Sequence, residues 1–291
     1  MAKCKFSLIL PARTTQGELD KFLSQLKSFP ETDSWELIVV DDHSEEMLAI
    51  KDQPGKILRM PGPSGAAASR NRGAAEARGE YLVFMSVFLS LPEDYLGQLE
   101  RFVVKYNFDF AQHPIRTSTD LTQSHFQMYI GNQAGRVSPK KDNLPVKQSL
   151  FTAAVVPHKV FAEARGFDGE MQHYGGHEMD LIYRLEKKGH GKRVLIDTIE
   201  LERTSVSSRS RTIERLRQYG KTGLPNLLNK HPELNRTVLV GEWVWWPLYQ
   251  VGLTRFGEFI LSGTIKLNIK LPGFIYRLYL HLVVRNAWDS R

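Results

Sequence analysis

Two acidic residues, Glu178 and Asp180, follow the Gly175-Gly176 pair at the predicted start of a helix. A carboxylate on a rigid element beside a flexible glycine turn can act as a general base toward a substrate at that turn. The structural alternative is that the helix dipole favours acidic residues in a first turn. His173 and His177 do not favour a metal pair, because the glycines between them interrupt a helix and the HExxH pattern is absent.

A second acidic pair, Asp41 and Asp42, ends the apolar segment WELIVVDD, which is typical of a buried strand. Carboxylates in this position can accept hydrogen bonds from a nucleotide base and ribose. Equally, aspartates at a strand end form Asx turns or cap the next helix. Both interpretations stay open on the residues alone.

The stretch GPSGAAASRNRG places Gly62 and Ser64 before a predicted helix of small residues, with Arg70 inside it. The N-terminus of a helix can bind phosphate. The spacing matches neither a P-loop nor a Rossmann fingerprint, however. Close packing of small residues against a sheet explains the stretch as well.

A cluster of cations follows the last predicted strand. Such a cluster is either a clamp for phosphate oxygens or a solvated face. Its members are Arg203, Arg209, Arg211, Arg215, Arg217 and Lys221.

The elements that position these residues alternate as strand, helix, strand, strand, helix, strand over about the first 90 residues. The strands are apolar on both faces, which predicts an α/β protein with a mostly parallel sheet covered by helices. Ligands of such sheets bind at the carboxyl ends of the strands. The segments that follow the predicted strands are Pro11 to Arg13, Asp41 to His43, Gly62 to Ser64, and Ser86 to Leu89.

The composition is basic, with a formal net charge of +7 and a pI near 9.4. This charge suits phosphate-bearing ligands, anionic lipid or nucleic acid. We expect no nucleic-acid partner, because no zinc-finger spacing or RNP-type aromatic run is present. The single cysteine, Cys4, excludes an internal disulfide and indicates a reducing compartment, and the first residues read as a strand rather than a signal peptide.

Five segments in order resemble the family 2 glycosyltransferases of bacterial type, which have the GT-A fold. The resemblance covers about Phe6 to Pro232. The segments are SLILPAR, ELIVVDDHSEE, GPSGAAASRNRGAAEARGEYLVF, GFDGEMQHYGGHEMDLIYRLEKKGH and RQYGKTGLPNLLNKHPEL.

This resemblance implies transfer of a sugar from a nucleotide-sugar donor to an acceptor hydroxyl, with inversion. Asp41 or Asp42 would bind the nucleoside, Glu178 would be the catalytic base, and Asp180 would be the second acid of that motif. The acceptor would approach Gly175, Gly176 and His177. The donor site would comprise Pro11, Arg13, Asp41, Asp42, Gly62, Ser64, Arg70, Ser86 and Phe88.

The chain departs from the family at the segment FMSVFL, where members carry the D-x-D motif that holds a divalent cation. Ser86 and Phe88 replace both carboxylates, so the resemblance implies a degenerate motif and no metal cofactor. Either fixed cations stabilise the departing diphosphate, or the chain is an inactive homologue that binds nucleotide or acts as a scaffold. The cations of the first alternative are Arg211, Arg215 or Lys221, with Arg70 or Arg13 nearby.

Residues 1–236 are expected to form the glycosyltransferase-like domain, and residues 237–291 a helical, aromatic-rich tail. Cations interrupt the tail, so no run reaches the roughly 20 apolar residues that span a bilayer. Aromatics mixed with Lys and Arg suit helices on a membrane surface; packing on the domain or in a homo-oligomer is the alternative. A surface tail would fit a carbohydrate or lipid-linked acceptor of envelope polysaccharide synthesis, with the protein cytoplasmic or peripheral on the inner membrane face.

Overall fold

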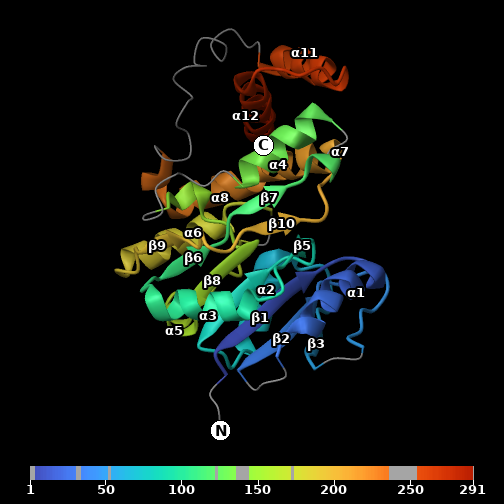
Figure 1. Ribbon diagram of the computed structural model, residues 1–291. Helices are drawn as coiled ribbons and strands as arrows, with labels where there is room; N and C mark the ends of the chain where they lie inside the picture. Colours follow the sequence, from blue (N-terminus) through green and yellow to red (C-terminus); the bar gives the residue numbers. More distant parts are fainter. Residues whose placement is uncertain are drawn as a thin grey trace.

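The large sheet of the computed structural model has seven strands in the order β3-β2-β1-β4-β8-β6-β9 (Figure 1). The structure describes residues 4–30, 34–51, 54–121, 124–135, 144–171, 174–235 and 254–290. All strands of the large sheet run parallel except β8, which is antiparallel to β4 and β6. In sheet order the strands are Lys56–Arg59, Trp35–Asp41, Phe6–Ala12, Tyr81–Met85, Ala153–Pro157, Phe110–Gln112 and Arg193–Leu195.

Helices cover both faces of this sheet, because alternate strand residues feed two separate hydrophobic clusters. Leu8 and Leu10 of β1 pack with α1 and α3, whereas Ile9 packs with α2, α5 and α6. Burial on both faces explains the continuous apolar runs of the strands. The helices are α1 (Gln16–Gln25), α3 (Tyr95–Lys105), α2 (Gly65–Ala75), α5 (His158–Glu163) and α6 (His177–Lys187).

A second sheet of three short strands lies between the large sheet and the C-terminal helices (Figure 1). Its order is β5 (Leu89–Ser90), β10 (Leu201–Arg203) and β7 (Ile115–Thr117). The residue pairs Arg203–Leu89 and Arg203–Thr117 lie opposite each other across the strands. Strand β5, which follows the turn after β4, is therefore paired with β10.

The C-terminal helices form a layer of their own around Ile213, Tyr276, Tyr279 and Val283. In this layer α12 packs on α7, on the π-helix η4 and on α11. The helices are α4 (His125–Gly135), α7 (Arg209–Gln218), η4 (Tyr219–Gly223), α8 (Leu224–Lys230), α11 (Thr254–Lys266) and α12 (Gly273–Asp289). Four short 3-10 helices, η1, η2, η3 and η5, span Leu26–Ser28, Thr119–Leu121, Val146–Gln148 and Pro232–Leu234.

The predicted α/β class, the mostly parallel sheet and the helical C-terminal region are confirmed. The predicted tail begins at residue 237, and its part up to residue 253 lies outside the described residues, as does His173. Within the described ranges no helix is both long and apolar enough to cross a membrane.

Candidate functional site

Asp41 ends β2 at the carboxyl edge of the large sheet, and its side chain is fully buried. Its Oδ1 accepts a hydrogen bond from the Ser44 amide at 2.8 Å, and its Oδ2 lies 2.5 Å from Arg59 Nη1. Burial alone raises the pKa of Asp41, but the hydrogen bonds from Ser44 and Leu48 and the charge of Arg59 outweigh it. The pKa of Asp41 is therefore lowered, and the residue is an internal anion.

Asp42 connects the end of β2 to the start of α2. Its Oδ1 accepts a hydrogen bond from the Ser64 amide at 2.7 Å, and its Oδ2 accepts one from the Gly65 amide at 3.0 Å. These amides open the helix and have no partner within it, so Asp42 caps α2 across a gap of more than 20 residues. Asp42 therefore acts as a helix cap, which is one of the two interpretations that the sequence leaves open.

Glu178 and Arg70 form the central ion pair of the site. Arg70 Nη1 lies 3.0 Å from Glu178 Oε1, and the Phe151 amide donates to the same oxygen at 3.2 Å. Arg70 is buried against the rings of Phe151 and Phe167, and its Nε has no hydrogen-bond partner. Within the described ranges Glu178 Oε2 accepts no hydrogen bond, and the Glu178 side chain is 21% exposed to solvent.

Asp180 lies in the same helical turn as Glu178 but is almost fully buried. Its Oδ2 is paired with Arg184 Nη2 at 2.8 Å, and its Oδ1 lies 2.8 Å from His231 Nε2. Both carboxylate oxygens are thus occupied by the protein. The two acids of the same helix turn have different surroundings.

The glycine turn before α6 lies against the π-helix η4. Gly175 and Gly176 adopt φ values of +88° and +87°, which favour glycine over other residues. A Cβ at Gly176 would lie 2.9 Å from the carbonyl oxygen of Gly223, so neither position has room for a side chain. Through this contact the basic segment reaches the turn, and the Arg215 guanidinium lies 5.4 Å from the ring centre of Tyr174.

His177 follows this turn as the first residue of α6. Its ring packs edge-on against Phe167, and its Nδ1 is buried without a hydrogen-bond partner. Burial lowers the pKa of His177, and the charge of Glu178 only partly opposes this effect.

The turn after β4 carries Ser86 and Phe88. Ser86 Oγ accepts a hydrogen bond from the Phe88 amide at 3.3 Å, and the Phe88 carbonyl accepts one from the Thr204 amide at 3.0 Å. The Phe88 ring packs on the larger hydrophobic cluster. A hydroxyl and a phenyl ring do not fit a divalent cation, which prefers carboxylate oxygens. Throughout the described ranges, no group of three His, Cys, Asp or Glu side chains could hold a metal.

The other predicted site residues are exposed or half-buried. Arg13 is exposed after the half-buried Pro11, and the Gly62 carbonyl accepts a hydrogen bond from Ser64 Oγ at 2.9 Å. Arg211 and Lys221 are exposed and form no ion pair with any described residue. The sequence predicts a role in donor binding for Arg70 and in catalysis for Glu178. It does not predict their contact, because the two residues are 108 positions apart.

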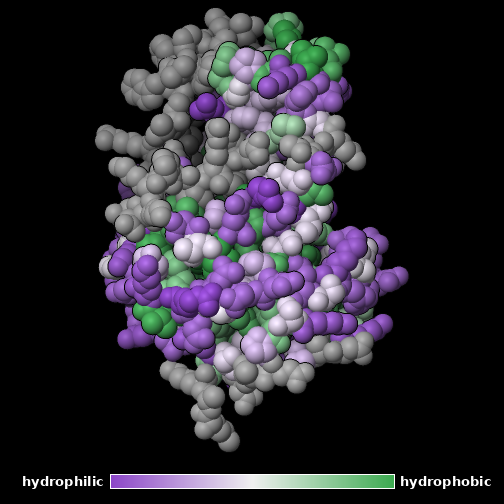
Figure 2. Space-filling model, viewed as in Figure 1, coloured by the Kyte–Doolittle hydropathy of each residue, from purple (hydrophilic) through white to green (hydrophobic). Residues whose placement is uncertain are grey.

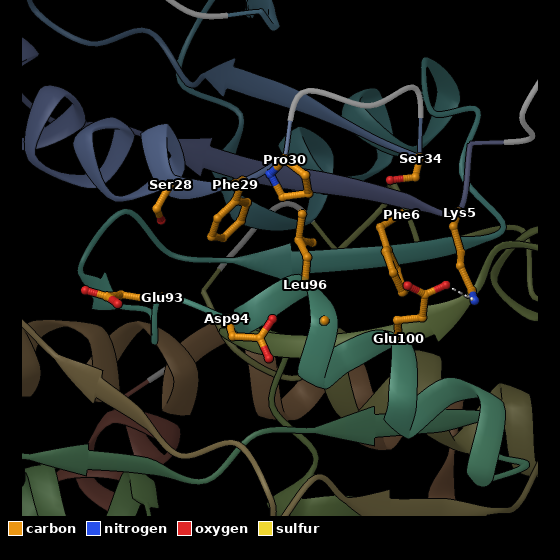
Figure 3. A pocket seen from close by; sticks show the side chains of 11 residues that line it. Lys5, Phe6, Ser28, Phe29, Pro30, Ser34, Glu93, Asp94, Leu96 and Glu100 are labelled. Atoms are coloured by element: carbon orange, nitrogen blue, oxygen red, sulfur yellow. Dashed lines mark hydrogen bonds and ion pairs between the residues drawn. The ribbon is translucent and has the colours of Figure 1, made fainter.

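A cavity of about 400 Å³ lies away from these residues (Figure 3). Lys5 and Phe6 line it at the amino end of β1, together with Glu93, Asp94 and Glu100 beside α3. Lys5 is paired with Glu100 across one side of it at 2.8 Å. The cavity is therefore at the opposite end of β1 from Asp41 and Asp42.

Comparisons with known proteins agree with this architecture. The Glycosyl transferase family 2 pattern matches residues 7–153, half of the chain, and the chain belongs to that family. An uncharacterized glycosyltransferase of Haemophilus influenzae is 29% identical over 114 residues, and the match spans 38% of each chain.

Solved structures show the same fold at low sequence identity. The mannosyltransferase PcManGT of Pyrobaculum calidifontis, solved with GDP-Man and Mn²⁺, has a TM-score of 0.62 and 14% identity; the match covers 100% of this chain and 89% of that one. GalNAc-T7, solved with UDP, GalNAc and Mn²⁺, has a TM-score of 0.51 and 13% identity over 75% of this chain and 48% of that one. The chain therefore combines membership of glycosyl transferase family 2 with the fold of these solved structures.

Proposed function

We propose that this protein transfers a sugar with inversion from a nucleotide-sugar donor to an acceptor hydroxyl, and that it needs no divalent cation. The observation that carries the proposal is the asymmetry of Glu178. Arg70 and the Phe151 amide hold Oε1, while Oε2 is left without a hydrogen bond from any described residue. A general base needs such a fixed carboxylate with one oxygen available to the substrate.

In the proposed reaction, Glu178 Oε2 accepts the proton of the acceptor hydroxyl. The acceptor oxygen forms a bond to the anomeric carbon from the face opposite the diphosphate. The bond between that carbon and the diphosphate oxygen breaks, and its electron pair leaves with the nucleoside diphosphate. Fixed cations near the basic segment, with Arg215, Arg211 and Lys221 as candidates, oppose the charge that develops.

Asp180 and Asp42, the residue after β2, receive supporting roles in this proposal. Asp180 fixes the first turn of α6 through Arg184 and His231. Asp42 fixes the start of α2, the helix that carries Arg70. Their effect on catalysis is to hold Arg70 and Glu178 in register.

The acceptor is proposed to be carried by a lipid or polysaccharide of the bacterial envelope, reached from the inner face of the cytoplasmic membrane. Large apolar side chains are exposed over α11, the loop that follows it and the start of α12, and hydrophobic residues gather over α11 at the top of Figure 2. These side chains are Phe256, Phe259, Ile260, Leu267, Ile269 and Phe274. The exposed cations between them are Arg255, Lys266, Lys270 and Arg277.

This surface suits an anionic lipid headgroup region, because its cations form no ion pair with the described residues. The one acid of α11, Glu258, is already paired with Arg217 at 2.8 Å. Apolar side chains interleaved with unpaired cations are typical of elements that lie in a membrane interface.

The test of the reaction is turnover of the donor by the full chain. The wild type is incubated with a panel of nucleotide-sugars and a bacterial lipid and polysaccharide extract, and nucleoside diphosphate release is measured. We expect release with at least one donor, and a loss of about 100-fold or more in Glu178→Gln with donor binding retained. Equal release by both proteins would contradict the role of Glu178, and no release from any donor would favour an inactive homologue.

A further inference from the structure

Arg203 is the last residue of β10, and the described protein gives it no counter-ion. The side chain is half-buried, its Nε is fully buried, and that atom has no hydrogen-bond partner. Burial lowers the pKa of Arg203, and no carboxylate opposes this effect. A cation that is partly removed from water is ordinarily paired, because its desolvation is unfavourable without a partner.

A second unsatisfied polar atom lies beside it. Thr117 is the partner of Arg203 in the parallel pairing of β7 and β10, so both side chains are on the same face of the small sheet. Thr117 Oγ1 is also buried without a hydrogen-bond partner. The helix α4 packs against Thr117, since a Cβ at Gly131 would lie 2.9 Å from Thr117 Cγ2.

The place of this pair in the fold indicates what it binds. Arg203 lies opposite Leu89 of β5, and the next residue, Thr204, donates its amide to the Phe88 carbonyl at 3.0 Å. The unsatisfied pair therefore lies next to the Ser86–Phe88 turn, whose side chains carry no charge. The strand beside this turn presents a positive charge to which the described residues give no partner.

We propose that Arg203 and Thr117 form an oxyanion site for the diphosphate of the donor, beside the Ser86–Phe88 turn. The guanidinium and the hydroxyl are both donors, and the ligand supplies the acceptor oxygens that the protein lacks. When the bond from the anomeric carbon to the diphosphate breaks, the electron pair moves onto an oxygen that Arg203 stabilises. This inference rests on the proposed function.

The pair also differs from the cations that the sequence indicates. Arg211 and Lys221 are exposed to solvent, where a charge is strongly screened. Arg203 lies between two strands and is half-buried, so its charge is screened less than that of an exposed cation. We therefore assign the contact with the diphosphate to Arg203, and an outer role to the exposed cations of α7 and η4.

The test uses inorganic pyrophosphate and then UDP and GDP, all in EDTA, with binding measured by calorimetry and melting temperature. We expect Arg203→Met to weaken pyrophosphate binding by about tenfold or more. Because the native guanidinium lacks a partner, the ligand-free variant should melt at or above the wild-type temperature. Arg203→Lys should restore part of the binding, and Thr117→Val should weaken it by a smaller factor.

The control is Arg101→Gln, which removes an exposed arginine of α3 whose partner is Asp94 at the surface. It should bind pyrophosphate as the wild type does. Wild-type binding that is unchanged in Arg203→Met would overturn the inference while leaving the transferase proposal intact. Absence of pyrophosphate binding by the wild type would also overturn the inference. If pyrophosphate binds but no nucleotide-sugar is turned over, the result counts against the transferase proposal alone. A large loss of ligand-free stability in Arg203→Met would show a structural role instead.

Discussion

Glu178 and Asp180 occupy the same turn of α6, yet among the described residues Glu178 has one carboxylate oxygen without a hydrogen-bond partner and Asp180 has none. Arg70 and the Phe151 amide share Oε1 of Glu178, whereas Arg184 and His231 occupy both oxygens of Asp180. The two carboxylates therefore serve as an informative pair of variants. One is proposed to act on the substrate, and the other positions the helix.

Asp180→Asn is expected to lower the free energy of unfolding by about 3 kcal/mol, because it leaves Arg184 without its buried partner. Below its lower melting temperature the variant should keep much of its turnover. Glu178→Gln should also be less stable, because the buried Arg70 loses its counter-ion, but unlike Asp180→Asn it should show little turnover even below its melting temperature. Denaturant unfolding and donor turnover, measured on both proteins, test this. If Asp180→Asn folds normally and is inactive, Asp180 belongs to the chemistry instead.

His113 predicts a pH dependence of stability. Burial lowers the pKa of this residue to about 4, with a small opposing effect from the Ile199 carbonyl. That carbonyl can only accept, so Nδ1 carries the proton and Nε2 accepts from the Tyr95 hydroxyl at 3.0 Å. The unfolded chain takes up a proton near pH 6.5, whereas the folded one does so near pH 4.

Stability is therefore expected to fall by about 3 kcal/mol between pH 6.5 and pH 4 through this group, and to gain nothing from it above pH 6.5. His113→Gln should be less stable at pH 7 but should lose less on acidification. Urea unfolding of both proteins at several pH values measures the difference. Parallel curves for the two proteins would mean that His113 is not the group responsible.

At the scale of elements, the apolar runs predict most of the strands because the central strands of the large sheet are buried on both faces. The reversed direction of β8 was not predictable, since the residues before it form a weakly patterned segment with two short strands and α4. The contact of Asp41 with Arg59 depends on the register of β2 and β3, in which these residues are opposite each other. The arrangement around Glu178 requires α2 with Arg70, α6 with Glu178 and the segment with Phe151 to meet. No local sequence pattern predicts this contact.

The packing of α12 on the π-helix η4 predicts one sharp substitution. A Cβ at Gly220 would collide with the Val284 carbonyl oxygen of α12. Gly220→Ala should lower the free energy of unfolding by about 1–3 kcal/mol, because α12 must shift. The control, Gly263→Ala in α11, has no atom within 4 Å of the new Cβ and should be neutral or slightly stabilising. Similar melting temperatures for the two variants would show that α12 does not dock as described.

At the scale of the whole molecule, the apolar surface over α11 predicts binding to anionic vesicles. Phe259 is 76% exposed in that surface, and Val104 of α3 is 75% exposed elsewhere. The wild type should float with phosphatidylglycerol vesicles and not with neutral ones. Phe259→Glu should float markedly less, and Val104→Glu should behave as the wild type. A full chain that never floats would contradict the membrane proposal, and self-association through this face would appear in sedimentation instead.

The central claim is that side chains, and no bound ion, oppose the charge of the donor diphosphate. It is tested most directly by calorimetric titration of a nucleotide-sugar panel into the full chain, once in EDTA and once in Mn²⁺. We predict that the accepted donor binds with the same affinity in both buffers. Binding that appears only when Mn²⁺ is present would contradict the account.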